Sequence, residues 1–406
     1  AEITAKTESP HKVMISKKPP FKIHIIAGEH SGDALGGKLM QALKEELGSE
    51  NVSFQGLGSE AMEKEGLKSL FPMEEVAIMG PFAILMRLPN LIKRVHQCVD
   101  HVLEHNPDGL IIIDSPEFTH PIAKRVRQKA PHIPIVNYVS PTIWAWRPGR
   151  AKKMKPYVDE VLALLPFEPQ KHKELGGPSC HYVGHPLIEQ KQWIKELDEE
   201  SLKIKLGLDP QAKVLTILPG SRSNEIKHLM QPFGEVVGLL EKEVGPLEVL
   251  LPTVNSVKEA VREAVKSWPI RPLIIEGKED KFKAFKCANA SLAASGTVTL
   301  ELALTGTPMV VAYKYDKLLH LLRPLIKADM FALANHILGK KAFPEYIQYD
   351  CTPENITRAL APLFDTTSKE YKEQKSHLDQ IEENMFAAGK RPSIAAAKQS
   401  IATIYK

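Results

Sequence analysis

The sequence is poor in the residues that mark several common protein classes. Its four cysteines, Cys98, Cys180, Cys287 and Cys351, lie far apart in 406 residues and form no CxxC pair. Neither a zinc site nor a dense disulfide framework is therefore predicted, and scattered thiols of this kind are typical of a reducing cytoplasm. The formal net charge is only +4, which gives no indication of nucleic-acid binding.

Long apolar runs are missing as well. Residues 1–20 lack the apolar core of a secretion signal, and we expect them to form a disordered tail. The most apolar segment, residues 76–97, has an uninterrupted run of about half the roughly 20 residues that a membrane span requires. It predicts either a helix lying on a membrane, with Arg87, Lys93 and Arg94 toward anionic headgroups, or a buried helix of the first domain.

What the sequence does contain is an alternation of short apolar runs and longer segments of helical period. The runs cover residues 21–28, 52–58, 108–114, 133–140 and 160–167 in the first half, and 213–220, 247–254, 271–277, 290–295 and 308–314 in the second. Near-continuous apolar strands separated by helices are typical of parallel sheets covered on both faces.

The pattern therefore predicts an α/β protein with two doubly wound, Rossmann-like domains. We expect the first domain at residues 21–186 and the second at residues 187–367, with the join near a Gly-His-Pro turn. Residues 368–406 have helical composition and no strand, and we expect them to pack back on the first domain.

Ligands of open parallel sheets bind outside the carboxyl ends of the strands, so the residues after each run are the candidates. The first run ends in GEHSGD, which is neither a GxGxxG nucleotide motif nor the GxSxG elbow of hydrolases. Ser31 and Asp33 can cap the next helix, which leaves Glu29 and His30 as polar contacts. The alternative is a simple capped turn.

Asp114 directly follows the third apolar run, in the stretch IIIDSPEFTH. A carboxylate there would be partly desolvated and more basic, as general-base chemistry near neutral pH requires. The alternative is that Asp114 caps the helix expected after Pro121 or pairs with a basic residue. In the following loop, Trp144 and Trp146 either wall a pocket or form a structural plug.

Two stretches of the second half combine small, hydroxylated and charged residues at a strand end. In LPGSRSNEI, residues 218–226, a glycine, two serines and Arg222 stand where a helix would begin. The first amides of a helix have no partner within it and carry partial positive charge, so we expect them to hold an anion.

The second stretch, ASGTVTLE, has the same character. Ser295, Gly296 and Thr297 would begin a helix, and Glu301 lies one turn further along the same face. Amides and hydroxyls there can hold a diphosphate while the carboxylate accepts from ribose hydroxyls, unless Glu301 is an ordinary helix charge. No DxD motif is placed to hold a divalent ion. We therefore expect no catalytic metal, and we expect Arg222 and helix ends to stabilise the charge of the departing diphosphate.

These stretches together carry a resemblance to a known family. GEHSGD, VSPTIWAWR, GHP, LPGSRSNEI and ASGTVTLE, in this order and spacing, resemble the lipid-A-disaccharide synthases, which are inverting glycosyltransferases of the GT-B fold. The resemblance implies two domains facing a central cleft and no cofactor. It also implies transfer of 2,3-diacylglucosamine from UDP to the 6-hydroxyl of 2,3-diacylglucosamine 1-phosphate, forming a β-1,6 disaccharide 1-phosphate and UDP.

The resemblance also assigns residues. It makes Asp114 the plausible base on the acceptor hydroxyl and implies that the UDP part is bound by Ser221, Arg222, Asn255, Ser295, Gly296, Thr297 and Glu301. On the acceptor side of the cleft it implies Glu29, His30, Ser31, Trp144, Trp146 and Asn335. The chain departs from the usual pattern at Glu117 and Thr119, where the family has Asp and Asn, and at His30 and Ala334.

The implied substrates predict a cytoplasmic enzyme held peripherally at the inner membrane. Residues 317–341 mix Leu, Ile and basic residues, and would either extend a lipid-facing surface or pack between the subunits of a homodimer. Two other functions stay open from sequence: a different GT-B UDP-sugar enzyme, such as an epimerase, and a non-catalytic nucleotide-binding scaffold at the membrane.

Overall fold

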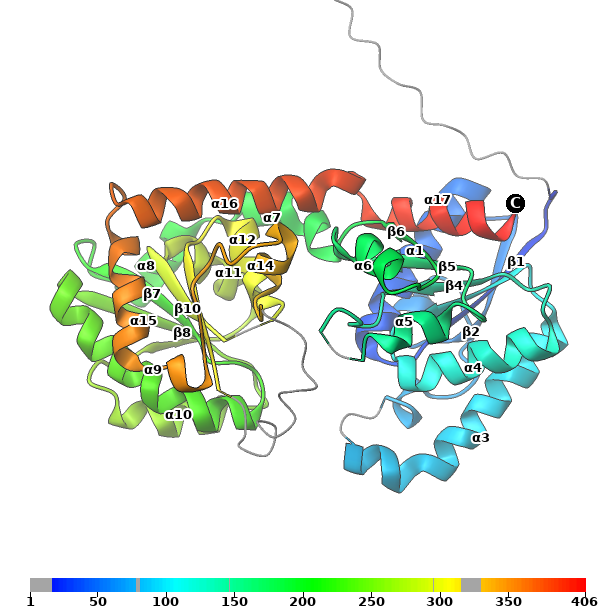
Figure 1. The fold of residues 1–406 in the computed structure, drawn as a ribbon, viewed down its shortest axis with the longest axis horizontal. Helices are drawn as coiled ribbons and strands as arrows, with labels where there is room; N and C mark the ends of the chain where they lie inside the picture. Colours follow the sequence, from blue (N-terminus) through cyan, green and yellow to red (C-terminus); the bar gives the residue numbers. More distant parts are fainter. Residues whose placement is uncertain (1–16, 78–80, 146, 295, 315–329) are drawn as a thin grey trace, which may run out of the picture. The chain divides into compact units, whose positions relative to one another are not determined.

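Two parallel sheets organise the protein, one in each of two units. The computed structural model describes residues 17–406 except 78–80, 146, 295 and 315–329, and leaves the side chains of 81–87 undescribed. The first unit contains the chain up to Pro186 together with Ala388–Lys406, and the second is Leu187–Ala387 (Figure 1). The expected tail, residues 1–20, lies for the most part outside the described residues.

The sheet of the first unit has the strand order β2-β1-β3-β4-β5-β6. Its strands are β1 (Phe21–Ala27), β2 (Val52–Leu57), β3 (Gly109–Ile113), β4 (Ile135–Tyr138), β5 (Glu160–Ala163) and β6 (Ser179–Tyr182). Every residue of β3, β4 and β5 is buried, which explains why these runs are continuously apolar rather than alternating.

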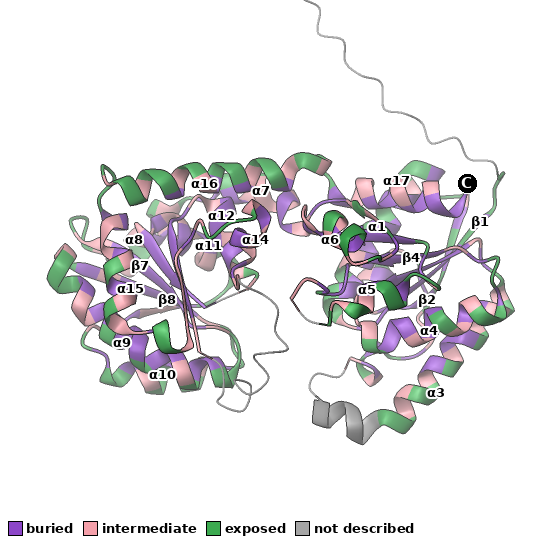
Figure 2. Cartoon of the chain, viewed as in Figure 1, coloured by how far each residue is buried: buried purple, intermediate pink, exposed green. Residues whose placement is uncertain are grey.

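Helices cover both faces of this sheet. They are α1 (His30–Leu47), α2 (Glu60–Lys64), α3 (Pro81–His105), α4 (Pro116–Lys129), α5 (Gly149–Met154), α6 (Glu168–Glu174) and α17 (Pro392–Ile404). α1 packs against α17, and α3 packs against α4, on opposite sides of the strands (Figure 1). Figure 2 shows the result, with buried strands between helices whose outer faces are exposed.

The second unit repeats this architecture with the strand order β12-β11-β10-β7-β8-β9. Its strands are β7 (Lys213–Leu218), β8 (Leu247–Pro252), β9 (Leu273–Ile275), β10 (Ala290–Ala293), β11 (Met309–Tyr313) and β12 (Glu345–Ile347). Its helices are α7 (Lys191–Glu196), α8 (Glu199–Leu206), α9 (Ser223–Val244), α10 (Lys258–Ala264), α11 (Lys278–Cys287), α12 (Val298–Thr305), α14 (Leu333–Leu338), α15 (Pro353–Leu360) and α16 (Lys369–Met385).

All ten apolar runs contain a strand, but each sheet also has a sixth strand that the sequence did not reveal. β6 has the sequence SCHY and alternates between exposed and half-buried residues, and β12 is only three half-buried residues long. Both lie at a sheet edge. An edge strand has one neighbour and less cover, so it needs no continuous apolar run.

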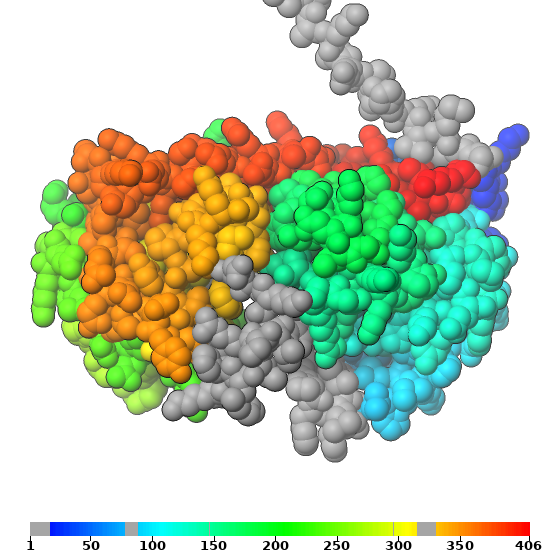
Figure 3. Space-filling view, viewed as in Figure 1, coloured from blue at the N-terminus to red at the C-terminus, as the bar shows by residue number. Residues whose placement is uncertain are grey.

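The C-terminal segment divides between the two units, which corrects one expectation. α16 stays in the second unit, where the Gln374 side chain pairs with the backbone N–H and C=O of Met309, both at 2.8 Å. Only α17 returns to the first unit, where Tyr405 donates to Asp108 at 3.2 Å and Figure 3 shows this red helix on the surface. The segment that returns is therefore Ala388–Lys406 and not the whole of residues 368–406.

Strand order determines where each unit can hold a ligand. In the first sheet the chain leaves β1 toward β2 on one side and later adds β3 on the other, and in the second sheet β7 and β10 have the same relation. The last residues of these pairs are in register, Ala27 with Ile113 and Leu218 with Ala293. A crevice opens at such a switch point because the helices that follow the two strands go to opposite faces.

Candidate active site

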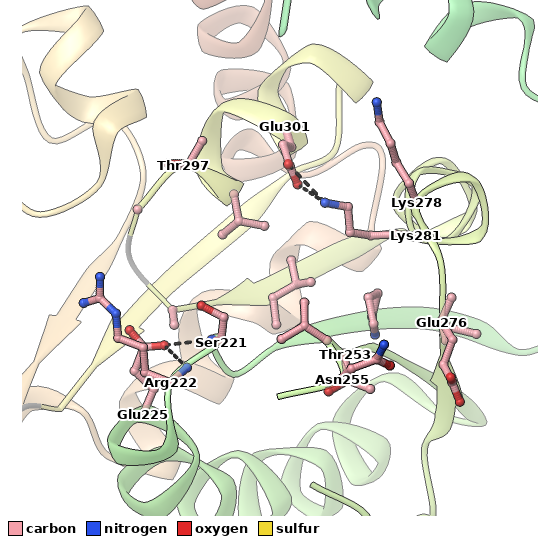
Figure 4. Close-up of a pocket in the computed structure, with 18 of the residues that line it drawn as sticks. Ser221, Arg222, Glu225, Thr253, Asn255, Glu276, Lys278, Lys281, Thr297 and Glu301 are labelled. Atoms are coloured by element: carbon pink, nitrogen blue, oxygen red, sulfur yellow. Dashed lines mark hydrogen bonds and ion pairs between the residues drawn. The ribbon is translucent and has the colours of Figure 1, made fainter. Parts of the chain in front are cut away.

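The second unit has a cavity of about 960 Å³ at its switch point (Figure 4). Its walls come from the segments that follow the carboxyl ends of β7, β8, β9 and β10, and from Tyr313 at the end of β11. The polar and glycine lining consists of Gly220, Ser221, Arg222, Glu225, Thr253, Asn255, Glu276, Gly277, Lys278, Lys281, Gly296, Thr297 and Glu301. The two predicted anion-binding stretches therefore meet in one cavity.

The two amides immediately before α9 hold an anion, and that anion belongs to the protein. The buried Glu225 carboxylate accepts from the amides of Ser221 at 2.8 Å and Arg222 at 3.1 Å, and from the Tyr313 hydroxyl at 3.2 Å. Gly220 makes this possible, because its φ is +105° and a Cβ there would lie 2.1 Å from a Glu225 oxygen. The amides of Ser221 and Arg222 are therefore engaged within the protein, while anion binding by the amides inside the first turn of α9, which begins at Ser223, stays a prediction.

The Arg222 side chain remains available for a ligand at the start of α9. Arg222 is exposed and forms no ion pair with any residue that the structure describes. Figure 4 shows its guanidinium extending toward the side of the cavity on which Thr297 lies. A guanidinium presents five donors and stays charged, which suits it to binding phosphate oxygens.

The opposite wall is formed by the start of α12. Gly296 has φ +120°, which favours glycine, and Thr297 precedes the first residue of the helix. Glu301 lies in the first turn, and both of its carboxylate oxygens accept from Lys281 of α11, at 3.1 and 2.8 Å. The predicted Ser295 lies outside the described residues.

The two asparagines assigned by resemblance have different surroundings. Asn255 follows β8 and lines the cavity. Asn335 is fully buried in α14, and its amide donates to Phe343 and Glu345 and accepts from the Phe343 backbone, each at 2.9 Å. The hydrogen bonds of Asn335 are thus used to hold the loop before β12, and it is not part of this cavity wall.

The switch point of the first unit brings together Glu29 and Asp114. Gly28 permits this approach, because a Cβ on it would lie 2.6 Å from the Ser115 Cβ. Asp114 itself has φ +52°, a left-handed conformation that non-glycine residues adopt rarely and often at functional sites. Burial and a hydrogen-bonded Glu29 carboxyl raise the pKa of Asp114 to about 7, although the Ser115 amide opposes the shift.

The helix after Asp114 begins at Pro116, not after Pro121 as expected. The Asp114 carboxylate accepts from the adjacent Ser115 amide at 2.9 Å and does not cap the helix interior. Glu117, one of the departures from the family pattern, is exposed and forms an ion pair with Arg150.

The remaining residues of the GEHSGD stretch have two different roles: some lie exposed beside Glu29, and one holds two helices together. Ser31 is exposed and donates to Glu29 at 3.0 Å, and His30 is exposed beside it. Asp33 does not cap α1; it is buried and accepts from three amides at the start of α2, those of Ser59, Ala61 and Met62. Its carboxylate therefore joins α1 to α2.

Trp144 is half-buried and has specific partners. Its indole N–H donates to the buried Glu168 carboxyl at 3.3 Å, and its ring packs edge-on against Phe167. Burial raises the pKa of Glu168 to about 8. These contacts favour the structural alternative for Trp144, while Trp146 lies outside the described residues.

Sequence reasoning missed several residues of the cavity wall. Lys278 and Lys281 lie on α11, Glu276 precedes that helix, and Thr253 follows β8. They belong to no recognisable motif, and α11 has the composition of an ordinary charged surface helix. The only signal that could have indicated them is their position after the strand ends at residues 252 and 275.

Comparisons with known proteins identify the family of this chain. A family model described as lipid-A-disaccharide synthetase matches residues 23–399. The chain belongs to the lipid-A-disaccharide synthase family. It is 45% identical over 395 residues to a lipid-A-disaccharide synthase of Bradyrhizobium diazoefficiens, covering 97% of this chain and 99% of that protein. It is 48% identical over 377 residues to one of Rhodopseudomonas palustris, covering 93% and 94%.

Membership of the lipid-A-disaccharide synthase family confirms the resemblance seen in the motifs and makes this chain a glycosyltransferase of the hexosyltransferase class.

The fold is also similar to solved structures. A UDP-GlcNAc 2-epimerase from Neisseria meningitidis, bound to UDP-GlcNAc, matches with a TM-score of 0.60, 13% identity and coverage of 94% and 98%. A glycosyltransferase from Rickettsia africae matches with a TM-score of 0.58, 12% identity and coverage of 95% and 99%. These likenesses show the predicted GT-B fold.

The predicted membrane-facing segment is described only in part. Residues 78–80 and the side chains of 81–87, Arg87 included, lie outside the described part. Further along α3, Leu88 and Ile92 are 43% and 47% exposed, while Arg94 donates to Glu75 and lies over the Phe71 ring. Arg94 is therefore engaged within the protein and not directed to headgroups as expected.

The described part of the chain has neither a membrane-spanning helix nor a cluster of metal ligands. No described helix combines the length and apolarity needed to cross a membrane, and no three His, Cys, Asp or Glu side chains of the described part are grouped as metal ligands. The second lipid-facing candidate, residues 317–341, is described only from Met330 onward.

Replacing Glu225 tests whether it is the anion at the start of α9. Glu225→Ala removes the acceptor of two backbone amides and a tyrosine hydroxyl, so we expect the free energy of unfolding to fall by about 1–3 kcal/mol without nucleotide present. Chemical denaturation measures this. Tyr313→Phe, which removes only one of the three hydrogen bonds, should cost about 0.5–1.5 kcal/mol. An unchanged Glu225→Ala stability would contradict the internal cap.

Proposed function

We propose that this chain transfers 2,3-diacylglucosamine from its UDP conjugate to the 6-hydroxyl of 2,3-diacylglucosamine 1-phosphate, with inversion and without a metal ion. The products are the β-1,6 disaccharide 1-phosphate and UDP. Beyond family membership, the proposal is supported by the cavity of the second unit, where one wall holds the Arg222 guanidinium, which pairs with no carboxylate among the described residues, and another holds the Glu301 carboxylate fixed by Lys281. A nucleoside diphosphate needs such a pair, because its phosphates are anionic and its ribose offers hydroxyl donors.

On the donor side, the Arg222 guanidinium binds the diphosphate together with the Ser221 hydroxyl and the start of α12 at Gly296 and Thr297. The Glu301 carboxylate accepts from the ribose hydroxyls, and Asn255 lines the same cavity. As the bond to the sugar breaks, its electron pair passes to the diphosphate oxygen. Arg222 stabilises that growing charge in place of a metal ion.

On the acceptor side, Asp114 takes the proton of the 6-hydroxyl as that oxygen bonds to the anomeric carbon. A pKa near 7 suits this role, because the carboxylate is then basic enough to accept the proton and still ionised in a useful fraction of molecules. Glu29, hydrogen-bonded to Asp114, maintains the raised pKa. Glu29 and its partner Ser31 also lie where the acceptor sugar would bind.

The acyl chains of both substrates require an apolar surface. The exposed Leu88 and Ile92 and the exposed Lys93 of α3 supply apolar and cationic groups for peripheral contact with a cytoplasmic membrane face. Homodimer formation through residues 317–341 remains a prediction.

Replacing the base separates catalysis from donor binding. Asp114→Asn keeps the size of the side chain but cannot accept the proton, so we expect turnover to fall by about 10²–10⁴-fold while UDP affinity, measured by calorimetry, stays within about twofold. Glu117→Gln, three residues away on an exposed side chain, is the control and should retain transfer. Undiminished transfer by Asp114→Asn would remove Asp114 from the mechanism.

Replacing Arg222 tests the diphosphate contact. Arg222→Ala should weaken UDP binding by about 1.5–3 kcal/mol, the range for hydrogen bonds to charged groups. Uridine lacks phosphates, so its affinity should not change. Lys227→Ala, exposed on the same helix and outside the cavity wall, controls for a general loss of positive charge. Equal losses for UDP and uridine would place the diphosphate elsewhere.

The pH dependence of the rate tests the carboxyl pair. Because the folded-state pKa of Asp114 is raised, the base is protonated and inactive at low pH, and kcat/KM should fall as pH falls through about 7. Glu29→Gln removes one of the causes of the shift, so the midpoint should move to lower pH. Rate profiles between about pH 5 and 9 show this, and an unmoved midpoint would exclude coupling between the two side chains.

A further inference from the structure

Glu301 is held by a lysine that no motif of the sequence indicated. The Lys281 ammonium spans the carboxylate, 3.1 Å from one oxygen and 2.8 Å from the other. The Glu301 side chain is only 16% exposed and that of Lys281 30%. Figure 4 shows the two side chains meeting at the cavity wall, one from α12 and one from α11. A bridged carboxylate cannot rotate freely about its terminal bond.

The geometry leaves Glu301 with the acceptor capacity that a ribose requires. An ionised carboxylate has about four lone-pair positions, two on each oxygen. Lys281 occupies one position on each oxygen, so one position on each oxygen remains. Two adjacent acceptors match the 2′- and 3′-hydroxyls of a ribose, which are two adjacent donors.

The support behind Lys281 is rigid. Its helix is anchored by Phe282 and Phe285, both buried, whose rings lie 5.5 Å apart and 5.1 and 5.9 Å from the Lys281 ammonium. The nearby carboxylate of Glu276 does not compete for Lys281, because Lys258 and Arg262 bind it.

The other cavity lysine has a different environment. Lys278, one turn earlier on α11, places its ammonium 5.0 Å from the centre of the Trp193 ring. It contributes positive charge to the same cavity, and no contact between it and Glu301 is among those of the described residues. Lys278 is therefore a matched control, because it brings a positive charge to the cavity but forms no ion pair with Glu301 among the contacts of the described residues.

We propose that Lys281 is a positioning residue, which orients the Glu301 carboxylate toward the ribose diol and so makes the donor site selective for ribonucleotides. The inference rests on the proposed donor site. Lys281 does not touch the reacting atoms, so its effect should appear in donor binding and KM and not in kcat.

The test compares affinities for UDP and 2′-deoxy-UDP by calorimetry on the full chain. The wild type should bind UDP about tenfold or more tightly, the value of one hydrogen bond to a charged acceptor. Lys281→Met should reduce that ratio to about threefold or less, and Lys281→Arg, which can still span both oxygens, should keep it within about twofold of wild type. Donor KM should rise in Lys281→Met while kcat stays within about twofold.

Two further variants separate the possible failures. Glu301→Ala, which removes the acceptor, should abolish the preference for UDP; if it does not, the ribose contact assigned to Glu301 in the proposed function is wrong. If Glu301→Ala loses the preference and Lys281→Met keeps it, the donor site stands and the positioning role is refuted. Lys278→Met should weaken both nucleotides equally and leave their ratio unchanged.

One more outcome would overturn the inference. If Lys281→Met weakens UDP and 2′-deoxy-UDP by the same factor, Lys281 supplies charge alone and does not orient Glu301. Circular dichroism confirms that each variant is folded, and Lys281→Gln replaces Lys281→Met if the latter does not fold.

Discussion

In each sheet, the helices that follow two neighbouring parallel strands pack on opposite faces of the sheet. The position of every candidate site residue depends on this arrangement. The strand ends remain in register, Ala27 beside Ile113 and Leu218 beside Ala293, and the segments that follow them line the space beyond. Segments separated by about 75 to 85 residues thereby become neighbours. The carboxyl pair of Glu29 and Asp114 results in one unit, and the cavity between the start of α9 and the start of α12 results in the other.

Two carboxylates of the protein accept hydrogen bonds from backbone amides that could otherwise bind a ligand. Glu225 caps the start of α9, and Asp33 caps the start of α2. Both are buried, so their charges are stable there only because several N–H groups donate to them. The consequence for the donor cavity is that the amides of Ser221 and Arg222 are not available to a ligand, which leaves a larger share of its recognition to the side chains of Arg222 on one wall and Glu301 with Lys281 on another. Side chains can be replaced one at a time without unfolding a helix end, which makes the donor site open to direct test.

Much of the architecture was predictable because strands buried on both faces require unbroken apolar runs. Ten strands were found in this way, whereas β6 and β12 were missed because edge strands are half-exposed and short. The return of the C-terminal segment was predicted too broadly, since helical composition does not reveal which sheet a helix covers. Glu29, Asp114, Arg222 and Glu301 could be proposed from the sequence because each stands just after a strand or in the first turn of the helix that follows it, in a stretch rich in small residues. Lys281 was not, because a lysine in a charged helix has no sequence signal until its partner is known.

The sequence by itself determined the family, the alternation of strands and helices, and the chemical types available at the strand ends. These are local properties: burial period, turn-forming glycines and motifs a few residues long. Only the tertiary structure decided which charges meet. It showed that Glu225 takes the amides at the start of α9, that Asn335 holds a loop, that Glu29 hydrogen-bonds Asp114 and that Lys281 bridges Glu301. The reason is physical, because a hydrogen bond or ion pair depends on distances of about 3 Å between atoms, and residues far apart in the chain reach that distance only once the sheets have formed.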